Sequence, residues 1–170
     1  FAYGKDKDKL TFLGFVNIKD ELRDEAKEGI KLIKSAGIKP IMITGDAIDT
    51  ATSIAREVGL IDINNNMVLD SNMLAQMNDD EIKRNLSKIA VIARALPQDK
   101  SRMVNIIESM DLVVGMTGDG VNDAPALKKA NVGFAMGSGT EVAKEAADIV
   151  ILDNNILSIS KAILYGRTIF

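Results

Sequence analysis

Residues 112–130 read LVVGMTGDGVNDAPALKKA, and this stretch decides the fold. Its first five residues are an apolar, strand-like run. Its last part favours a helix, in which Pro125 is tolerated because the first turn needs no N–H bond there. A strand therefore delivers Asp119, Asn122 and Asp123 to the start of a helix. Carboxylates at such a strand end suit a hard cation such as Mg²⁺, and the N–H groups of a helix start suit a phosphate.

Strand-like and helix-like segments alternate along the whole chain, which predicts a parallel sheet with helices on both faces. The strand-like segments are 11–18, 38–43, 89–93, 112–116, 132–135 and 149–152. Helical spacing of apolar residues predicts helices over 20–36, 47–58, 99–110, 124–130, 141–147 and 156–169. Ligands of such sheets lie beyond the carboxyl ends of the strands, where Thr44, Lys100 and Asp119 all fall. We interpret 62–81, which is rich in Asn and Asp, as a surface excursion with a short helix.

The composition indicates one globular domain of 170 residues, with 46% hydrophobic and 26% charged residues. A net charge of −3 gives no argument for nucleic acid, and none is expected as a partner. The sequence has no Cys and no His, so chemistry here must rely on carboxylates, lysine, threonine and a hard metal. No apolar run approaches the roughly 20 residues that a membrane helix needs.

Four motifs, taken in order, resemble those of P-type ATPases, the ion pumps built on a haloacid dehalogenase-like core. Two are Met-Ile-Thr-Gly-Asp at 42–46 and Ala-Arg-Ala-Leu-Pro-Gln-Asp-Lys at 93–100. The others are the loop at 117–128 and the stretch 131–148 that follows it. Alone, Thr-Gly-Asp is more often a tight turn than a site, but several ordered motifs are far more specific than any one.

The resemblance implies a site for ATP and Mg²⁺. The residues that it places around ATP or the phosphoryl group are Thr44, Gly45, Asp46, Arg94, Lys100 and Asn122. Asp119 leaves its strand directly and is the better candidate for a Mg²⁺ ligand, with Asp123 as a second or outer-shell partner. The catalytic set is then Thr44, Lys100, Asp119, Asn122 and Asp123.

Two of these residues also have an ordinary structural interpretation that involves no catalytic role. Lys100, read alone, is a surface lysine near the start of a helix. Asp123 is a good N-cap for the helix that follows it, and that role is compatible with metal binding.

P-type ATPases form an aspartyl-phosphate on an Asp-Lys-Thr-Gly-Thr motif, and no such run occurs in this sequence. The resemblance is therefore to the C-terminal segment of the phosphorylation domain, without the nucleophile-bearing strand. It implies a linker from the nucleotide-binding domain at 1–9 and a phosphorylation-domain fragment at 10–170. Residues 156–170 would lead to a membrane helix. The segment by itself is expected to be soluble and inactive.

The resemblance also implies partners: ATP, a transported cation, and the actuator, nucleotide-binding and membrane domains of a pump. The parent would be a membrane protein with this segment on its cytoplasmic side. The runs at 126–130 and 165–168 favour the calcium-transporting branch. Two alternatives stay open: a soluble haloacid dehalogenase-like phosphatase, for which Asp20 is the candidate nucleophile, and a nucleotide- or Mg²⁺-binding module without catalysis.

The missing strand leaves a question about the sheet. The strands at 38–43 and 112–116 either pair directly, or another strand lies between them. We expect the second outcome, with 10–16 of this chain, or of a second copy in a strand-swapped homodimer, filling the place.

Overall fold

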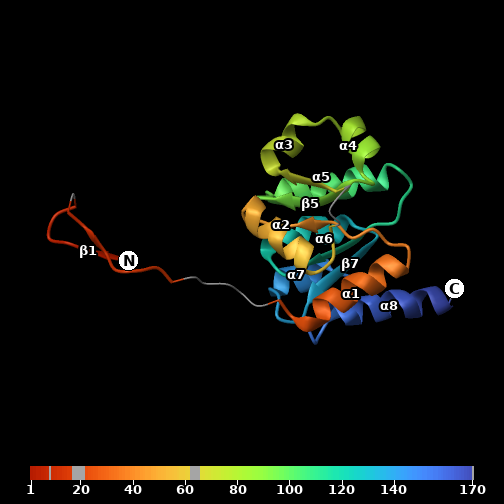
Figure 1. Cartoon of the computed structure of the whole chain (residues 1–170). Helices are drawn as coiled ribbons and strands as arrows, with labels where there is room; N and C mark the ends of the chain where they lie inside the picture. The colour runs from red at the N-terminus through yellow and green to blue at the C-terminus, as the bar shows by residue number, and fades with distance from the viewer. Residues whose placement is uncertain (8, 17–21, 62–65, 170) are drawn as a thin grey trace.

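The computed structural model describes residues 1–7, 9–16, 22–61 and 66–169. Its main body contains two parallel sheets of three strands each, surrounded by helices (Figure 1). The first sheet has the order β3-β5-β4, formed by Met42–Ile43, Ile89–Ala93 and Met67–Asp70. The second has the order β6-β7-β8, formed by Gly115–Gly118, Val132–Met136 and Ile149–Ile151. The predicted parallel α/β architecture is therefore confirmed.

The helices match most of the predicted ones within a few residues. They are α1 (Asp24–Ser35), α2 (Ile48–Glu57), α3 (Ser71–Gln76), α4 (Asp79–Asn85), α5 (Pro97–Glu108), the short 3-10 helix η1 (Val121–Asp123), α6 (Ala124–Lys129), α7 (Glu141–Ala146) and α8 (Ile156–Ile169). No helix within the described ranges is long and apolar enough to cross a bilayer.

Strand β5 forms the centre of the first sheet, and all five of its residues are buried. Its side chains divide between two cores, without strict alternation because the pairing with β4 has a register shift between Met67 and Val68. Ile89 and Ile92 pack with α3, α4 and α5, whereas Ala90 and Val91 pack with α2. A strand buried on both faces needs a continuous apolar sequence, which Ile-Ala-Val-Ile-Ala supplies.

The interpretation of 62–81 as a surface excursion was wrong for the part that the structure describes. Residues 67–70 form the edge strand β4, which pairs with β5, and two helices follow it. Asp70 caps α3 by accepting from the N–H of Met73 at 2.8 Å. Asn78 and Glu81 form a reciprocal capping box on α4, with bonds of 2.9 and 2.8 Å. Asp70 and Asn78 are thus two of the polar residues that favoured a loop, and here they cap helices.

The strand predicted at 112–116 begins later, at Gly115. Asp111 ends the preceding helical segment with a positive φ of 57°, and Val113 is 83% exposed. Pairing starts only where Val114 enters the core: its N–H donates to Asn131 Oδ1 at 2.7 Å and its carbonyl accepts from Val132.

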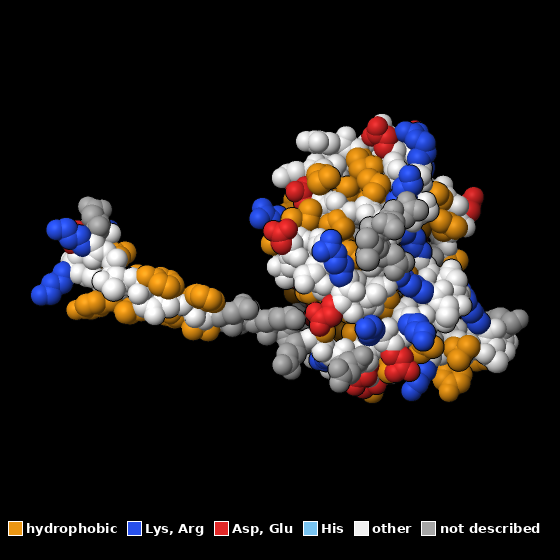
Figure 2. Space-filling model, in the orientation of Figure 1, with side chains coloured by type: hydrophobic (Ala, Val, Ile, Leu, Met, Phe, Trp, Pro, Cys, Tyr) orange, Lys and Arg blue, Asp and Glu red, His pale blue; other side chains and the backbone are white. Residues whose placement is uncertain are grey.

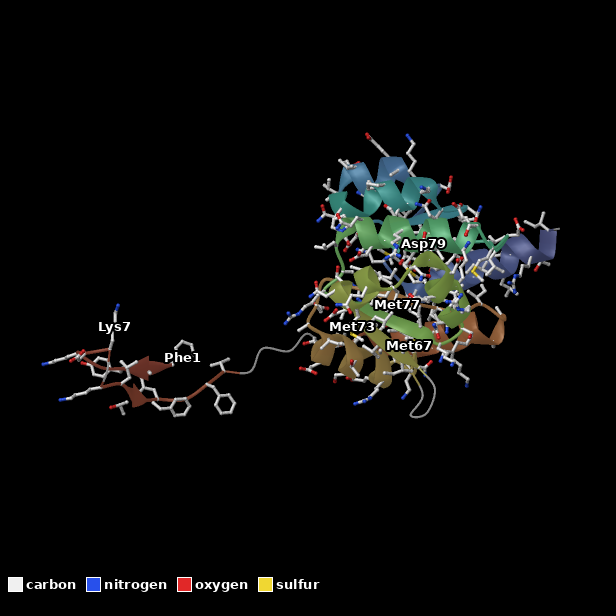
Figure 3. All side chains as sticks on the ribbon, turned by 90° about the horizontal axis from the view of Figure 1, so that it is seen from above. Phe1, Lys7, Met67, Met73, Met77 and Asp79 are labelled. Carbon is white, nitrogen blue, oxygen red and sulfur yellow. The ribbon has the colours of Figure 1, made fainter. Side chains whose placement is uncertain are left out.

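The N-terminal residues form a hairpin of β1 (Ala2–Tyr3) and β2 (Thr11–Phe12). Figure 1 shows this hairpin apart from the main body, Figure 2 shows exposed hydrophobic side chains along it, and Figure 3, turned by 90°, also shows it apart. The prediction that 10–16 of the same chain fill the place between the sheets was therefore wrong. Only two residues of the strand predicted at 11–18 are paired, and 17–18 lie outside the described residues.

The two sheets do not join. Strand β3 pairs only with β5, and β6 pairs only with β7, among the residues that the structure describes. The strands have thus not closed up on each other. Helix packing connects the half of the molecule that contains the first sheet to the half that contains the second. Val104 of α5 packs with Val114, Ala126 and Ala130 of the second half.

Candidate functional site

The loops after β3 and β5 are tied together at the carboxyl ends of the first sheet. Thr44 donates its N–H to Ile92 at 2.9 Å and accepts at its carbonyl from the N–H of Ala95 at 2.9 Å. The N–H of Arg94 donates to the carbonyl of Asp46, also at 2.9 Å. This linkage holds Arg94 at a φ of +47°, a left-handed conformation that a residue with a side chain adopts at a cost.

Thr44 and Asp46 also bond to each other. The Thr44 hydroxyl donates to Asp46 Oδ2 at 2.9 Å, and the N–H of Asp46 donates back to that hydroxyl at 3.2 Å. The sequence Thr-Gly-Asp thus forms a turn at the sheet edge, and the turn exposes Gly45 and Asp46.

The second part of the site is the ion pair between Lys100 and Asp123. Lys100 lies in the first turn of α5 and its Nζ contacts Asp123 Oδ1. The other oxygen, Oδ2, accepts from the N–H groups of Asp119 at 3.2 Å and Gly120 at 3.1 Å. The carboxylate does not cap α6, as one alternative had it. It instead fixes the backbone of the loop that carries Asp119.

Burial and hydrogen bonding act against each other on Asp123, which is 5% exposed. Burial raises the pKa of its carboxyl, but the hydrogen bond and charge of Lys100, with the two backbone N–H groups, outweigh it. The net pKa of Asp123 lies below its ordinary value. Asp123 is therefore an anion at neutral pH, and both of its oxygens are engaged.

Asp119 and Asn122, in contrast, are exposed. The Asp119 carboxylate takes part in no hydrogen bond or ion pair within the described part of the chain. This leaves the Asp119 carboxylate available to a cation, in the loop whose backbone Asp123 holds. Mg²⁺ in proteins is usually bound by one or two carboxylates together with waters and phosphate oxygens, so these residues fit that ion. No cluster of three carboxylates occurs among the described residues, so a cage made of protein alone is not present there.

Two glycines that sequence reasoning did not single out make the loop geometry feasible. A Cβ on Gly118 would collide with the Asp123 side chain. A Cβ on Gly139 would lie 2.8 Å from the Asp119 carbonyl, which accepts from the N–H of Thr140 at 2.8 Å. The motif at 131–148 therefore supports the loop from the far side. The small residues of this motif, such as Gly139, were the feature of the sequence that could have indicated this close contact.

The predicted residues fall into two groups. Thr44, Gly45, Asp46 and Arg94 follow the first sheet, whereas Asp119, Asn122 and Asp123 follow β6, with Lys100 reaching them from α5. No hydrogen bond links one group to the other among the residues described. Asp20, the candidate nucleophile of the phosphatase alternative, lies outside the described residues.

The chain is similar to known proteins in sequence and in fold. Residues 2–131 match a family model described as haloacid dehalogenase-like hydrolase, and 101–163 match a second model with the same description. The chain is 44% identical over 165 residues to calcium-transporting ATPase 1 of Lactococcus lactis, covering 97% of this chain and 19% of that protein. It is 43% identical over 177 residues to calcium-transporting ATPase PAT1 of Dictyostelium discoideum, covering 100% of this chain and 16% of that one. The chain thus spans about a fifth or less of the curated relatives that it matches.

Two solved structures have a similar fold. The catalytic domain of the CPx-ATPase CopB-B superposes with a TM-score of 0.65 at 28% identity, over 86% of this chain and 47% of that one. A zinc-transporting PIB-type ATPase in its E2.Pi state superposes with a TM-score of 0.67 at 31% identity, over 88% of this chain and 20% of that one. The resemblance inferred from the four motifs is therefore confirmed over nearly the whole chain.

Proposed function

Because the chain belongs to the haloacid dehalogenase-like hydrolase family, we propose that it supplies the Mg²⁺- and phosphate-binding half of a phosphorylation site. The parent protein would be an ATP-driven, calcium-transporting P-type ATPase, as the names of its relatives suggest. The observation that supports this most is the Lys100–Asp123 pair, whose carboxylate also holds the Asp119 loop. The buried Asp123 carboxylate would thereby position both the Lys100 ammonium and Asp119, the candidate metal ligand.

The roles follow from what phosphoryl transfer needs, which is positioning and positive charge around the transferring oxygens. Lys100 brings an ammonium to a phosphate oxygen, since its charge is held at the site by Asp123. Thr44 offers a hydroxyl and Gly45 an exposed backbone. Asp119 would hold Mg²⁺, which supplies charge neutralisation when bound. Asp123 acts behind them and keeps the loop and the lysine in place.

Other residues at the same edge would contact the nucleotide. These are Asp46, Arg94 and Asn122, whose side chains are exposed. The backbone linkage between Arg94 and Asp46 keeps the two loops in one relative position. ATP would therefore meet a preformed edge on the first sheet and the Lys100–Asp119 group on the second.

The proposal extends to partners. The acceptor carboxylate and the actuator, nucleotide-binding and membrane domains would belong to the parent pump, with this segment on the cytoplasmic side. Residues 1–9 would link it to the nucleotide-binding domain. Strands β3 and β6 are each the edge strand of their sheet and offer hydrogen-bonding positions to a further strand, and residues 10–16 of a second copy would fill them in a strand-swapped homodimer.

The test of the proposed site is a ¹⁵N NMR titration of the chain with Mg²⁺ and a non-hydrolysable ATP analogue. We expect shifts at the amides of Thr44, Gly45 and the 118–123 loop. Asp119→Asn should remove the Mg²⁺-dependent part of these shifts. Asp111→Asn is the matched control, because Asp111 is exposed and has a positive φ that Asn tolerates. Shifts that avoid these loops, or that survive Asp119→Asn, would refute the assignment.

A further inference from the structure

Helix α5 has two faces that bind different halves of the molecule. Met103 and Ile106 pack in the core of β5, α3 and α4, whereas Val104 packs against α6. Lys100 lies one turn before Val104, so both side chains lie on the face toward α6. The position of Lys100 at the site therefore depends on how α5 is held from its other face.

That other face is held by a buried carboxylate. Asp99 is only 6% exposed, and charged residues are rarely so buried unless they have partners. Its Oδ2 accepts from the Ser71 hydroxyl at 2.7 Å and from the N–H of Leu96 at 2.8 Å. Leu96 precedes α5, and Ser71 is the first residue of α3. One oxygen thus joins the start of α5 to the start of α3.

A second tie follows one turn later on the same face. Arg102 donates to the carbonyls of Leu74 at 2.9 Å and Met77 at 2.7 Å, and to Asp79 Oδ1 at 2.7 and 3.0 Å. Figure 3 labels Met77, which follows α3, and Asp79, the first residue of α4. Arg102 fixes α5 to these residues but lies in the second turn. Within the described ranges, the side chain of Asp99 is what ties the first turn, which carries Lys100, to α3.

We propose that Asp99 is a positioning residue for Lys100 and that Ser71 is its partner. The inference rests on the proposed role of Lys100 toward phosphate. Asp99 and Lys100 are adjacent, and their side chains point to different sides of the helix. The Asp99–Ser71 bond fixes the rotation of the first turn against β4 and α3, and this rotation aims the Lys100 stem at Asp123. The segment 67–79 is therefore a support of the site.

The test measures the Lys100–Asp123 contact directly. Lysine-selective ¹H–¹⁵N NMR detects the Nζ of an ammonium whose protons exchange slowly because it is hydrogen-bonded. We expect a resolved Lys100 Nζ signal in the wild-type chain. In Ser71→Ala and Asp99→Asn the exchange of its protons with water should rise about tenfold, as expected for weakening one charge-assisted hydrogen bond.

Matched variants separate positioning from general destabilisation. Ser71→Thr keeps the hydroxyl and should restore the slow exchange. Ser101→Ala removes a hydroxyl from α5 that does not contact Asp99, and it should leave the exchange unchanged. Amides of β7 report that each variant is folded. If Asp99→Asn does not fold, Ser71→Ala against Ser71→Thr decides alone.

An unchanged Lys100 signal in folded Ser71→Ala would overturn the proposal. Equal loss of the slow Lys100 Nζ proton exchange in Ser71→Ala and Ser71→Thr would also overturn it, since the Ser71 hydroxyl would then not be what positions Lys100. Titration of the wild-type chain with Mg²⁺ and the ATP analogue is a separate measurement. If it gives no shift near Lys100 while the Ser71 variants behave as expected, the phosphate role fails and the positioning role stands.

Discussion

Asp123→Asn is the substitution that tests the centre of the site. The variant keeps the shape of the side chain but removes its charge. An amide oxygen still accepts from the N–H groups of Asp119 and Gly120. The amide NH₂ then faces the Lys100 ammonium, so two donors meet where an ion pair was. The lysine is left without its acceptor.

The structure sets the size of the effect. The side chains of Lys100 and Asp123 are 18% and 8% exposed, so the pair is largely but not fully desolvated. Breaking a fully buried pair from one side costs about 3–5 kcal/mol. Solvent around Lys100 reduces this, and we expect the free energy of unfolding to fall by about 2–4 kcal/mol. That is a large part of the roughly 5–15 kcal/mol typical of a domain.

Urea unfolding followed by circular dichroism measures this loss, provided that the denaturant slope is the same in both proteins. Asp119→Asn is the control, four residues away with an exposed carboxylate, and it should change the free energy of unfolding by no more than about 0.5 kcal/mol. If Asp123→Asn behaves like Asp119→Asn, the reasoning about the pair is wrong.

The pH dependence gives the same test a second readout. The pKa of folded Asp123 lies below its ordinary value, so its contribution to stability is fully present above the unfolded pKa of about 3.9. The contribution is lost as the pH falls through the lower, folded pKa. The difference in stability between the wild type and Asp123→Asn should therefore be constant near neutral pH and shrink in acid below pH 4. A difference that is constant into strong acid contradicts the assignment.

Three further outcomes are expected. The 170-residue chain incubated with radiolabelled ATP and Mg²⁺ should form no acid-stable, hydroxylamine-labile phosphoenzyme, and label on Asp20 would instead favour a phosphatase. Calorimetry should show Mg²⁺ affinity in the millimolar range or weaker, and weaker still in Asp119→Asn, because one or two carboxylates without a phosphate complete too little of the octahedral shell. Gly139→Ala should lower the free energy of unfolding by about 1–3 kcal/mol, since its Cβ would meet backbone oxygens of Asp119 and Met136 at 2.8 and 2.9 Å. Gly45→Ala is the control, because a Cβ built there meets no atom outside its chain neighbours within 4 Å, and it should leave the free energy of unfolding nearly unchanged.

The architecture was predictable because its signals are local. The apolar run at 89–93 is a strand with the predicted bounds, and the helix at 156–169 begins and ends where its spacing indicated. The placement of Thr44 and Asp119 at strand ends followed from parallel topology alone. These predictions needed no knowledge of which strands are neighbours.

The features that sequence reasoning missed depend on contacts between distant parts of the chain. Strand β4 has only three apolar residues, Met67 to Leu69, between polar flanks, and its pairing with β5 is what distinguishes it from a loop. The role of Asp123 as the holder of a loop could not be read from its position before a helix, where capping is the usual role. Asp99 gave no signal, because a carboxylate in the first turn of a helix is ordinary. Its burial appears only when α3 packs over it.

The proposed site lies across two sheets that share no hydrogen bonds in the described ranges, so backbone pairing cannot set the distance between its halves. Packing of α5 against α6, packing of α1 against α8 and the Lys100–Asp123 pair do so instead. Helix packing tolerates small shifts, whereas a sheet ladder fixes its register. The residues that hold α5 from behind therefore matter more here than they would in a continuous sheet. A strand placed between β3 and β6 would make this dependence weaker, so Ser71→Ala should disturb Lys100 less once such a strand is bound.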